Sequence, residues 1–192
     1  IILQFKKIQN NAKVLARFDV VVSHSLIAIN HNYSMPKFNN KNGLEIINGR
    51  HPVVEKLLPL NEDFISNDLT LIKNKKHLAI ITGPNMSGKS TFLRQTGLIV
   101  LLAQIGSFIP ANKCILSIVD QLFTRVGASD NLARGESTFL VEMNETANIL
   151  NNATDKSLII LDEIGRGTST FDGVSLAWAI TEHLHNNKKK RA

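Results

Sequence analysis

The sequence is poor in cysteine and lacks any long apolar run. Its 192 residues include one cysteine, Cys114, so no disulfide can form within the chain and no zinc site can be built from several cysteines. Such sparse use of cysteine favours a reducing compartment. The longest apolar stretch, residues 98–105, is interrupted by Gln104 and is much shorter than the roughly 20 residues that a membrane span needs. We therefore expect no membrane partner.

Signals for export or for a nucleic-acid surface are also weak. The first residue is Ile1 rather than methionine, and Lys6 and Lys7 lie inside the first helical stretch, which argues against a secretory signal and predicts a piece of a longer chain. The formal net charge of +6 is spread along the chain, so it permits contact with nucleic acid without arguing for it. The length suits one domain, or one domain with an appendage.

Residues 1–29 are predicted to form one long helix. A period of 3.5 residues is typical of a helix packed along another helix, and at 1.5 Å per residue the stretch would span about 43 Å. A lever or a coiled-coil arm is one interpretation, and an ordinary core helix is the other. The apolar residues recur in steps of four and three, with Asp19 in the one missing place: Ile1, Phe5, Ile8, Ala12, Leu15, Val22, Leu26 and Ile29.

The rest of the chain alternates predicted strands with predicted helices. Residues 30–43 are rich in Asn, Lys and Ser and are predicted to be a loop at a domain boundary, which divides the chain into residues 1–33 and 34–192. Alternating strands and helices indicate an α/β domain. Strands are predicted at 44–47, 53–58 and 158–161, a hairpin at 68–72 and 77–82, and helices from 89 onward, at 139–151 and at 173–186.

A glycine-rich motif follows the predicted strand 78–82. The stretch Gly83-Pro84-Asn85-Met86-Ser87-Gly88-Lys89-Ser90 has the P-loop pattern and precedes an apolar helix. Glycines let backbone N–H groups surround phosphate oxygens, and the helix N-terminus adds a partial positive charge. Lys89 would reach the β- and γ-phosphates, and the Ser90 hydroxyl would bind Mg²⁺. The alternative is a glycine-rich turn with an accidental lysine.

Two acids end the apolar strand 158–161. Asp162 is expected to hold Mg²⁺, and Glu163 to orient or deprotonate the attacking water, because buried parallel strands end at the face where ligands bind. The alternative is a pair of acids that caps the next element. A Glu directly after the Asp is the arrangement of ATPases that hydrolyse with their own base.

Three further polar features surround these motifs. Ser137 or Thr138 suits the N-cap of the helix whose expected apolar face is Phe139, Met143, Ala147 and Leu150, and Ser137 stands where ABC-type ATPases carry the serine that caps the γ-phosphate of the partner subunit. Residues 165–170 are expected to be a flexible polar loop at a dimer interface, or a plain linker. Gln104 could sense Mg²⁺ or water, or be a surface glutamine.

These motifs together resemble the MutS family of DNA mismatch-repair ATPases, in its mismatch-recognition branch. The resemblance runs from about Arg50 to the end of the chain, so the joint match is more specific than any one motif. The matching stretches are Gly49 to Glu55, Thr82 to Thr91, Gln104 to Ala111, Arg125 to Asp130, Ser137 to Met143 and Asp162 to Thr170.

The resemblance implies an ABC-type P-loop ATPase fold with a long N-terminal lever helix. Phe64 would stack on adenine, and the backbone of Ile65 would read the edge of the base, although Phe64 as a bare residue is more typical of a core. The catalytic residues would be Glu163, Lys89 and, from the partner subunit, Ser137. The remaining ATP contacts would come from Gly83, Pro84, Asn85, Met86, Ser87, Gly88, Lys89, Ser90 and Thr91, with Ser90 and Asp162 holding Mg²⁺.

The resemblance also implies partners and a location. They are mismatched double-stranded DNA bound through absent N-terminal domains, a second ATPase domain in a homodimer or paralogue heterodimer, and a MutL-like matchmaker protein. The location would be the cytoplasm and bacterial nucleoid, or the nucleus in a eukaryote. The family's Phe-x-Glu mismatch wedge is absent, and His183 and His185 precede the place of its sensing histidine, so this chain is not expected to read mismatches itself.

Two other functions compete with this interpretation. An ABC transporter ATPase would carry a Leu-Ser-Gly-Gly-Gln signature, for which residues 135–138 are a poor substitute. A nucleotide-gated binding module would bind ATP and switch shape without hydrolysing it. Phosphate release compared with ATP binding distinguishes the module from the enzyme.

Overall fold

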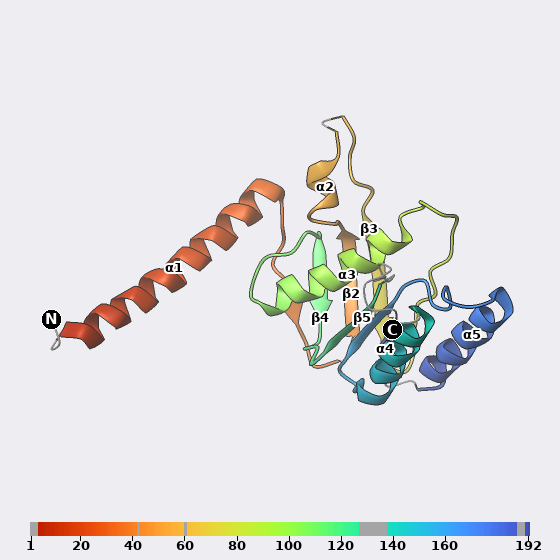
Figure 1. The fold of residues 1–192 in the computed structure, drawn as a ribbon. Coiled ribbons are helices and arrows are strands. Elements are labelled where there is room, and N and C mark those ends of the chain that lie inside the picture. Colours follow the sequence, from red (N-terminus) through yellow and green to blue (C-terminus); the bar gives the residue numbers. More distant parts are fainter. Residues whose placement is uncertain (1–3, 42, 60, 127–137, 188–190) are drawn as a thin grey trace.

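A computed structural model describes residues 4–41, 43–59, 61–126, 138–187 and 191–192 (Figure 1). Helices and strands alternate along most of it, which confirms the α/β class. In chain order the elements are α1 (Phe5–His31), β1 (Lys37–Phe38), β2 (Gly43–Gly49), α2 (Val54–Leu57), β3 (Asn67–Ile72), α3 (Lys89–Gln104), β4 (Lys113–Leu116), β5 (Leu122–Arg125), α4 (Thr138–Asn152), β6 (Leu158–Leu161) and α5 (Thr170–Asn186).

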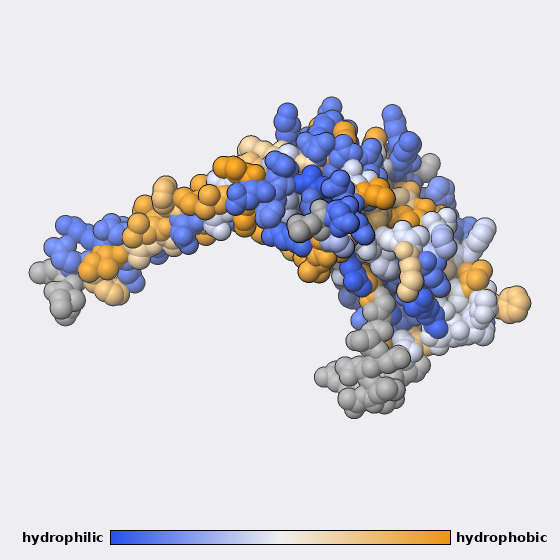
Figure 2. Space-filling view, turned by 90° about the horizontal axis from the view of Figure 1, so that it is seen from above, coloured by the Kyte–Doolittle hydropathy of each residue, from blue (hydrophilic) through white to orange (hydrophobic). Residues whose placement is uncertain are grey.

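The long N-terminal helix is present and projects away from the rest of the molecule (Figure 1). Within α1, Ala28 in the last turn is the one buried residue. The described apolar side chains of the predicted 3.5-residue seam are therefore exposed, Leu15 to 67% and Ile29 to 75%. Figure 2 shows them as an apolar surface along the projecting helix. The seam has no packing partner among the described residues, so α1 takes no part in the cores that these residues form.

The larger sheet has four strands in the order β1-β4-β2-β3. Strand β2 pairs antiparallel with both β3 and β4, and β1 pairs parallel with β4. Its apolar face and helix α3 enclose the main core, in which burial of each large aliphatic side chain contributes about 1.5–3 kcal/mol. The largest members of this core are Leu44, Ile46, Leu71, Ile99, Val100, Ile109, Leu116, Leu158 and Ile160.

The second sheet consists of the parallel strands β5 and β6. Helices α4 and α5 pack against it through a smaller core that includes Ile149, Ile159, Ile180 and Leu184. The last two residues extend this sheet, because Ile159 donates a backbone hydrogen bond to Arg191 at 2.9 Å, and Ala192 exchanges backbone hydrogen bonds with His77 and Ala79. The chain end therefore lies between β6 and the segment that leads to the P-loop motif.

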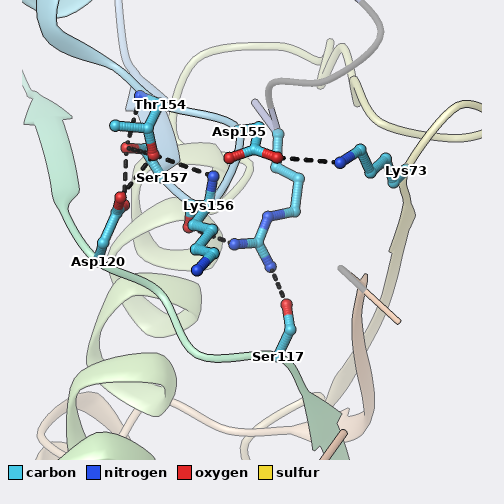
Figure 3. Close-up of polar contacts among 8 residues, drawn as sticks. Lys73, Ser117, Asp120, Thr154, Asp155, Lys156 and Ser157 are labelled. Carbon is cyan, nitrogen blue, oxygen red and sulfur yellow. Dashed lines mark hydrogen bonds and ion pairs between the residues drawn. The ribbon is translucent and has the colours of Figure 1, made fainter. Parts of the chain in front are cut away.

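Buried Arg191 forms a β-bridge with Leu158 and so fixes this chain end at the amino end of β6. Figure 3 labels groups around it, among them Ser117 and Lys156. The Arg191 guanidinium donates to the hydroxyl of Ser117 at 2.8 Å and to the carbonyl of Lys156. Burial lowers the pKa of the guanidinium. Beside it, burial opposes ionisation of Asp120, but hydrogen bonds from Thr154 and Ser157 outweigh that effect and lower the pKa of this carboxyl. The network holds the loops before β5 and β6 together.

Two predicted strands are wrong. Within residues 53–58 the chain forms the short helix α2 in place of a strand. The imidazole Nδ1 of His51 caps this helical turn by accepting from the backbone N–H groups of Val53 and Val54 at 3.3 Å. Residues 77–82 form no strand, although the turn after β3 is present, with Ile72 donating to Lys76 at 2.7 Å. Beyond Ala79 the segment has no neighbouring strand among the described residues, and Ile80 is 70% exposed.

Three strands were not predicted. Strand β1 lies inside the expected loop 30–43, and β4 and β5 follow α3. Each is short, with two residues in β1 and four in β4 and β5, which is too brief for a periodic pattern to be recognised. The predictions for β2, α3, α4, β6 and α5 are confirmed in type. Helix α5 begins at Thr170 rather than at residue 173, because the Ser169 hydroxyl caps it by accepting from Asp172 N–H.

The predicted apolar face of α4 is confirmed in part, because Phe139, Met143 and Leu150 are half-buried and Leu150 packs against the smaller core. The buried positions are Glu142, Thr146 and Ile149, whereas Ala147 is exposed. A shift of one residue turns a helix by about 100°, so a pattern of apolar residues alone pointed to the neighbouring face. The consequence for the site is that a carboxylate, rather than an aliphatic side chain, faces the interior.

Helix α2 is expected to become less stable in mild acid. Burial, reinforced by the nearby charge of Arg94, lowers the pKa of His51 below its usual value of about 6.5. The unfolded chain then binds a proton that the folded chain resists, so the free energy of unfolding decreases as pH falls below about 6.5. Urea unfolding at pH 7.5 and 5.5 measures this. His51→Asn, whose side-chain oxygen accepts at either pH, should show a smaller loss, and an equal loss would contradict the prediction.

Among the described residues, no helix combines the length and apolarity needed to cross a membrane.

Candidate nucleotide-binding site

The P-loop motif forms an exposed turn that leads directly into α3. Residues 82–88 are all exposed, and Gly88 is the N-cap of the helix. Gly88 has φ +88°, which L side chains rarely adopt, and its carbonyl accepts from Phe92 N–H at 2.9 Å in the first helical turn. Glycine at this position lets the loop enter the helix with the first N–H groups of α3 directed at the exposed turn. This geometry suits an anion.

The ammonium of Lys89 lies inside this turn. Its Nζ donates to the carbonyl of Gly83 at 2.8 Å and to that of Pro84 at 2.6 Å. These two bonds hold the positive charge beside the loop backbone rather than in open solvent. Ser90 and Thr91, in the first turn of α3, are half-buried. The turn therefore presents a fixed cation and a helix N-terminus together.

The two acids follow β6 as predicted, but their environments differ. Asp162 is 7% exposed, and its N–H donates to Arg125 at 2.7 Å, which continues the β5–β6 ladder. Glu163 is exposed, has φ +58°, and pairs with Arg166 at 2.7 Å between Oε2 and Nη1. A non-glycine residue with positive φ marks a sharp backbone turn after the strand. The chain thus directs one carboxylate inward and the other toward solvent.

Helix α3 and strand β6 are packed against each other, which links the two motifs. Gly97 of α3 lies so close to β6 that a Cβ on it would be 3.2 Å from Cδ1 of Ile160. In Figure 1, the segment before α3 and the loop after β6 lie on the same side of the molecule, next to the start of α5. Oxygen groups at the carboxyl end of β6 are the ligands that Mg²⁺ prefers.

The loop after the acids contacts two helices and is not a plain linker, while its expected flexibility and its place at a dimer interface stay predictions. Gly165 N–H donates to Oε1 of Glu142, a buried residue of α4, at 2.5 Å, so α4 holds the loop backbone. A Cβ on Gly165 would lie 2.6 Å from Cα of Gly173 in α5, and one on Gly167 would lie 2.8 Å from Cα of Phe139 in α4. The loop is therefore wedged between the starts of two helices, and its glycines are required by close backbone approach.

Other predicted residues lie elsewhere. Gln104 ends α3, about 22 Å along the helix from Lys89 at 1.5 Å per residue, and its Oε1 accepts from Val119 N–H at 2.7 Å. Gln104 is exposed, as the surface-glutamine interpretation expected, and lies at the end of α3 away from the P-loop turn. Phe64 is half-buried and Ile65 is 85% exposed in the segment between α2 and β3, where the Ile65 carbonyl accepts from the Asn67 amide.

Comparison with known proteins decides the family. The family model described as MutS domain V matches residues 79–192. The chain belongs to the MutS family. That match includes the P-loop motif, both acids and helices α3 to α5.

Curated MutS relatives agree over nearly the whole chain. The DNA mismatch repair protein MutS of Flavobacterium psychrophilum is 59% identical over 95% of this chain and 21% of its own length. The proteins of the same name from Flavobacterium johnsoniae and Salinibacter ruber are each 57% identical over 96% of this chain, and over 21% and 20% of their own lengths. The chain therefore spans about a fifth of the length of the MutS relatives it matches.

Two residues of this candidate site were not singled out from the sequence. Glu142 was not singled out because the apolar pattern pointed to the adjacent face of α4, although an acid within an apolar helix is the kind of departure that marks a buried polar contact. Arg166 was noted only as part of a polar loop. Ser137, the expected contribution to a partner's site, lies outside the described residues, which resume at Thr138.

Proposed function

We propose that this chain is the ATP-binding and ATP-hydrolysing part of a DNA mismatch-repair protein, with a P-loop fold of the ABC-ATPase type in residues 34–192. The observation that supports it most is the pairing of an anion-binding turn with a carboxylate. Lys89 and the start of α3 form the turn, and Asp162 ends the strand on which α3 packs. A triphosphate with its divalent cation needs both.

The residues present fit a Mg²⁺–ATP complex. Backbone N–H groups of residues 83–91 would surround the phosphate oxygens, and Lys89 would exchange the carbonyls of Gly83 and Pro84 for the β- and γ-phosphates. Mg²⁺ would be held by the hydroxyl of Ser90 and the carboxylate of Asp162, which are hard oxygen ligands. When bound, the metal neutralises charge that develops on the phosphates. Phe64 would stack on adenine, and Ile65 would contact the base edge through its backbone.

Glu163 would orient the attacking water and accept its proton. It is the exposed acid at the end of β6 and pairs with Arg166 at 2.7 Å, whereas Asp162 is buried. Release from Arg166 would free the carboxylate as a base. Ser137 would complete the site of a partner subunit, so two such domains would close around their nucleotides.

The proposal extends to the longer protein. Residues 1–33 would be the end of a lever that connects the ATPase domain to domains that bind mismatched DNA. The exposed apolar seam of α1 supports it, since an isolated helix with such a face needs other helices beside it. The partners would be a second ATPase domain, identical or paralogous, and a MutL-like matchmaker protein.

A nucleotide switch that does not hydrolyse ATP is the second candidate, favoured by the ion pair that occupies Glu163. Calorimetric titration of this chain with ATP, with and without Mg²⁺, tests binding, and a phosphate-release assay tests hydrolysis. Mg²⁺-dependent ATP binding supports the proposed site. ATP binding without phosphate release supports the switch. Absence of ATP binding overturns both candidate functions.

Glu163→Gln is expected to separate binding from chemistry. Loss of a positioned base slows proton transfer by about 10²–10⁴-fold, while the amide retains the shape of the side chain, so MgATP affinity should change little. Phosphate release at saturating MgATP measures this, with Glu182→Gln on the exposed face of α5 as the control. Normal turnover in Glu163→Gln would remove Glu163 as the base.

A further inference from the structure

We propose that Arg50 is a positioning residue that clamps the end of α1 to the segment carrying the adenine contact, so that nucleotide binding sets the direction of α1. This inference rests on the proposed function for its nucleotide-dependent part. Its structural part, the clamp itself, can be tested without nucleotide.

The first half of the clamp is at the end of α1. Arg50 Nη2 donates to the carbonyl of His31 at 2.8 Å and to that of Asn32 at 3.3 Å. The last carbonyls of a helix have no partner within the helix, and a cation there is favoured by the helix dipole. Asn32 terminates the helix in the left-handed conformation, with φ +51°, and leaves these carbonyls turned toward the guanidinium.

The second half of the clamp is on α2. Arg50 Nε lies 2.8 Å from Oε1 of Glu55, as an ion pair with side chains 16% and 31% exposed. The ring of Tyr33 lies under the guanidinium, 6.0 Å from its centroid to Cζ. Burial raises the pKa of Tyr33, and the negative charge of Glu55 adds to this effect, while the positive charge of Arg50 opposes it. These three groups therefore share a partly desolvated site.

The backbone on either side of Arg50 is tied to the core. Arg50 N–H donates to the Pro110 carbonyl at 2.8 Å. Gly49 lies against the P-loop helix, because a Cβ on it would be 2.7 Å from Nε2 of Gln95, which is buried in α3. Arg50 therefore sits between the P-loop helix on one side and the two carbonyls of α1 on the other, with little freedom to move independently of either.

The consequence for α1 follows from its exposure. Because residues 5–23 are all exposed, contacts at the carboxyl end of α1 decide its direction. On the other side, α2 is followed along the chain by Phe64 and then by β3. A displacement of this segment by an adenine ring would move Glu55, and through the ion pair would move the guanidinium that holds α1.

Distance measurements between spin labels test the clamp. Labels are attached at exposed positions by Lys13→Cys in α1 and Asn152→Cys in α4. The buried Cys114 does not compete, because burial raises the pKa of its thiol to about 12. Variants Arg50→Ala, Arg50→Lys and Glu55→Gln are compared with the unchanged chain, and Lys56→Ala, an exposed neighbour on α2, is the matched control.

Without nucleotide, Arg50→Ala is expected to broaden the distance distribution about twofold, while Lys56→Ala leaves it unchanged. Arg50→Lys should broaden it partly, since an ammonium cannot hold the carbonyls and Glu55 with the geometry of a guanidinium. Arg50→Lys serves as the test variant if Arg50→Ala does not fold. An unchanged distribution in the tested Arg50 variant overturns the clamp, whatever the outcome with ATP.

With MgATP, the unchanged chain is expected to show a shift in mean distance that Glu55→Gln loses while its affinity for MgATP stays within about twofold. A shift that persists in Glu55→Gln overturns the path through the ion pair, and a chain that binds MgATP without any shift overturns the coupling. If the chain does not bind MgATP, the proposed function is refuted, and the nucleotide-dependent coupling with it. The comparison without nucleotide then still decides whether the clamp exists.

Discussion

Replacing Lys89 by alanine is expected to weaken MgATP binding by about 10- to 150-fold, which corresponds to the 1.5–3 kcal/mol of a hydrogen bond to a charged group. The ammonium lies within the P-loop turn, against the carbonyls of Gly83 and Pro84. Removing it takes away the positive charge that the phosphates would meet and leaves two carbonyl dipoles facing them. Both effects weaken binding.

Calorimetric titration with MgATP measures the loss, and Lys113→Ala is the matched control. Lys113 is also a lysine with a fixed partner, Glu45 at 3.0 Å, but it lies on β4 of the four-stranded sheet and its side chain is 46% exposed. Its removal should leave MgATP affinity within about twofold, since the partner of Lys113 belongs to β2 and not to the P-loop turn. Equal affinities in Lys89→Ala and the unchanged chain would contradict the proposed site.

Gly165→Ala is expected to destabilise the fold by about 3 kcal/mol, because it combines a left-handed backbone with steric overlap. Gly165 has φ +84°, and a Cβ on it would lie 2.6 Å from Cα and 2.7 Å from the carbonyl oxygen of Gly173. Backbone atoms at the start of α5 cannot move aside as a flexible side chain could. The loop after the acids would have to separate from α5 or from Glu142.

Gly106→Ala separates the two contributions. Gly106 has nearly the same φ, +85°, but a Cβ on it would meet nothing within 4 Å. It should therefore show the conformational cost alone, about 1 kcal/mol. Urea unfolding followed by circular dichroism measures both variants, and similar losses of unfolding free energy would refute the close approach of Gly165 to Gly173.

Local sequence features predicted much of the α/β fold. Strand β6 is a continuous apolar stretch and α3 contains the apolar run 98–103, and these runs with their turn signals are sufficient to identify both elements. The P-loop pattern and the acids after β6 are short motifs in which spacing itself carries the information. The family match over residues 79–192 is consistent with these motifs, while the roles of the individual residues remain predictions.

Contacts between distant segments account for the errors. Residues 53–58 have a strand-like composition, yet a buried histidine caps them as a helical turn. Residues 80–82 have an apolar pattern, yet no strand lies beside them among the described residues, and a strand needs a partner for its backbone. In α4, the interior accepts Glu142 because the N–H of Gly165, 23 residues away, satisfies it.

The sequence by itself determined the α/β class, the long first helix, and the placement of a P-loop turn before one helix and two acids after one strand, because periodicity and motif spacing are properties of neighbouring residues. The tertiary structure alone decided which acid faces inward, that Glu142 holds the loop after those acids, and that Arg50 joins α1 to α2. Those outcomes depend on groups brought together from separate parts of the chain, where burial makes each polar group require a particular partner.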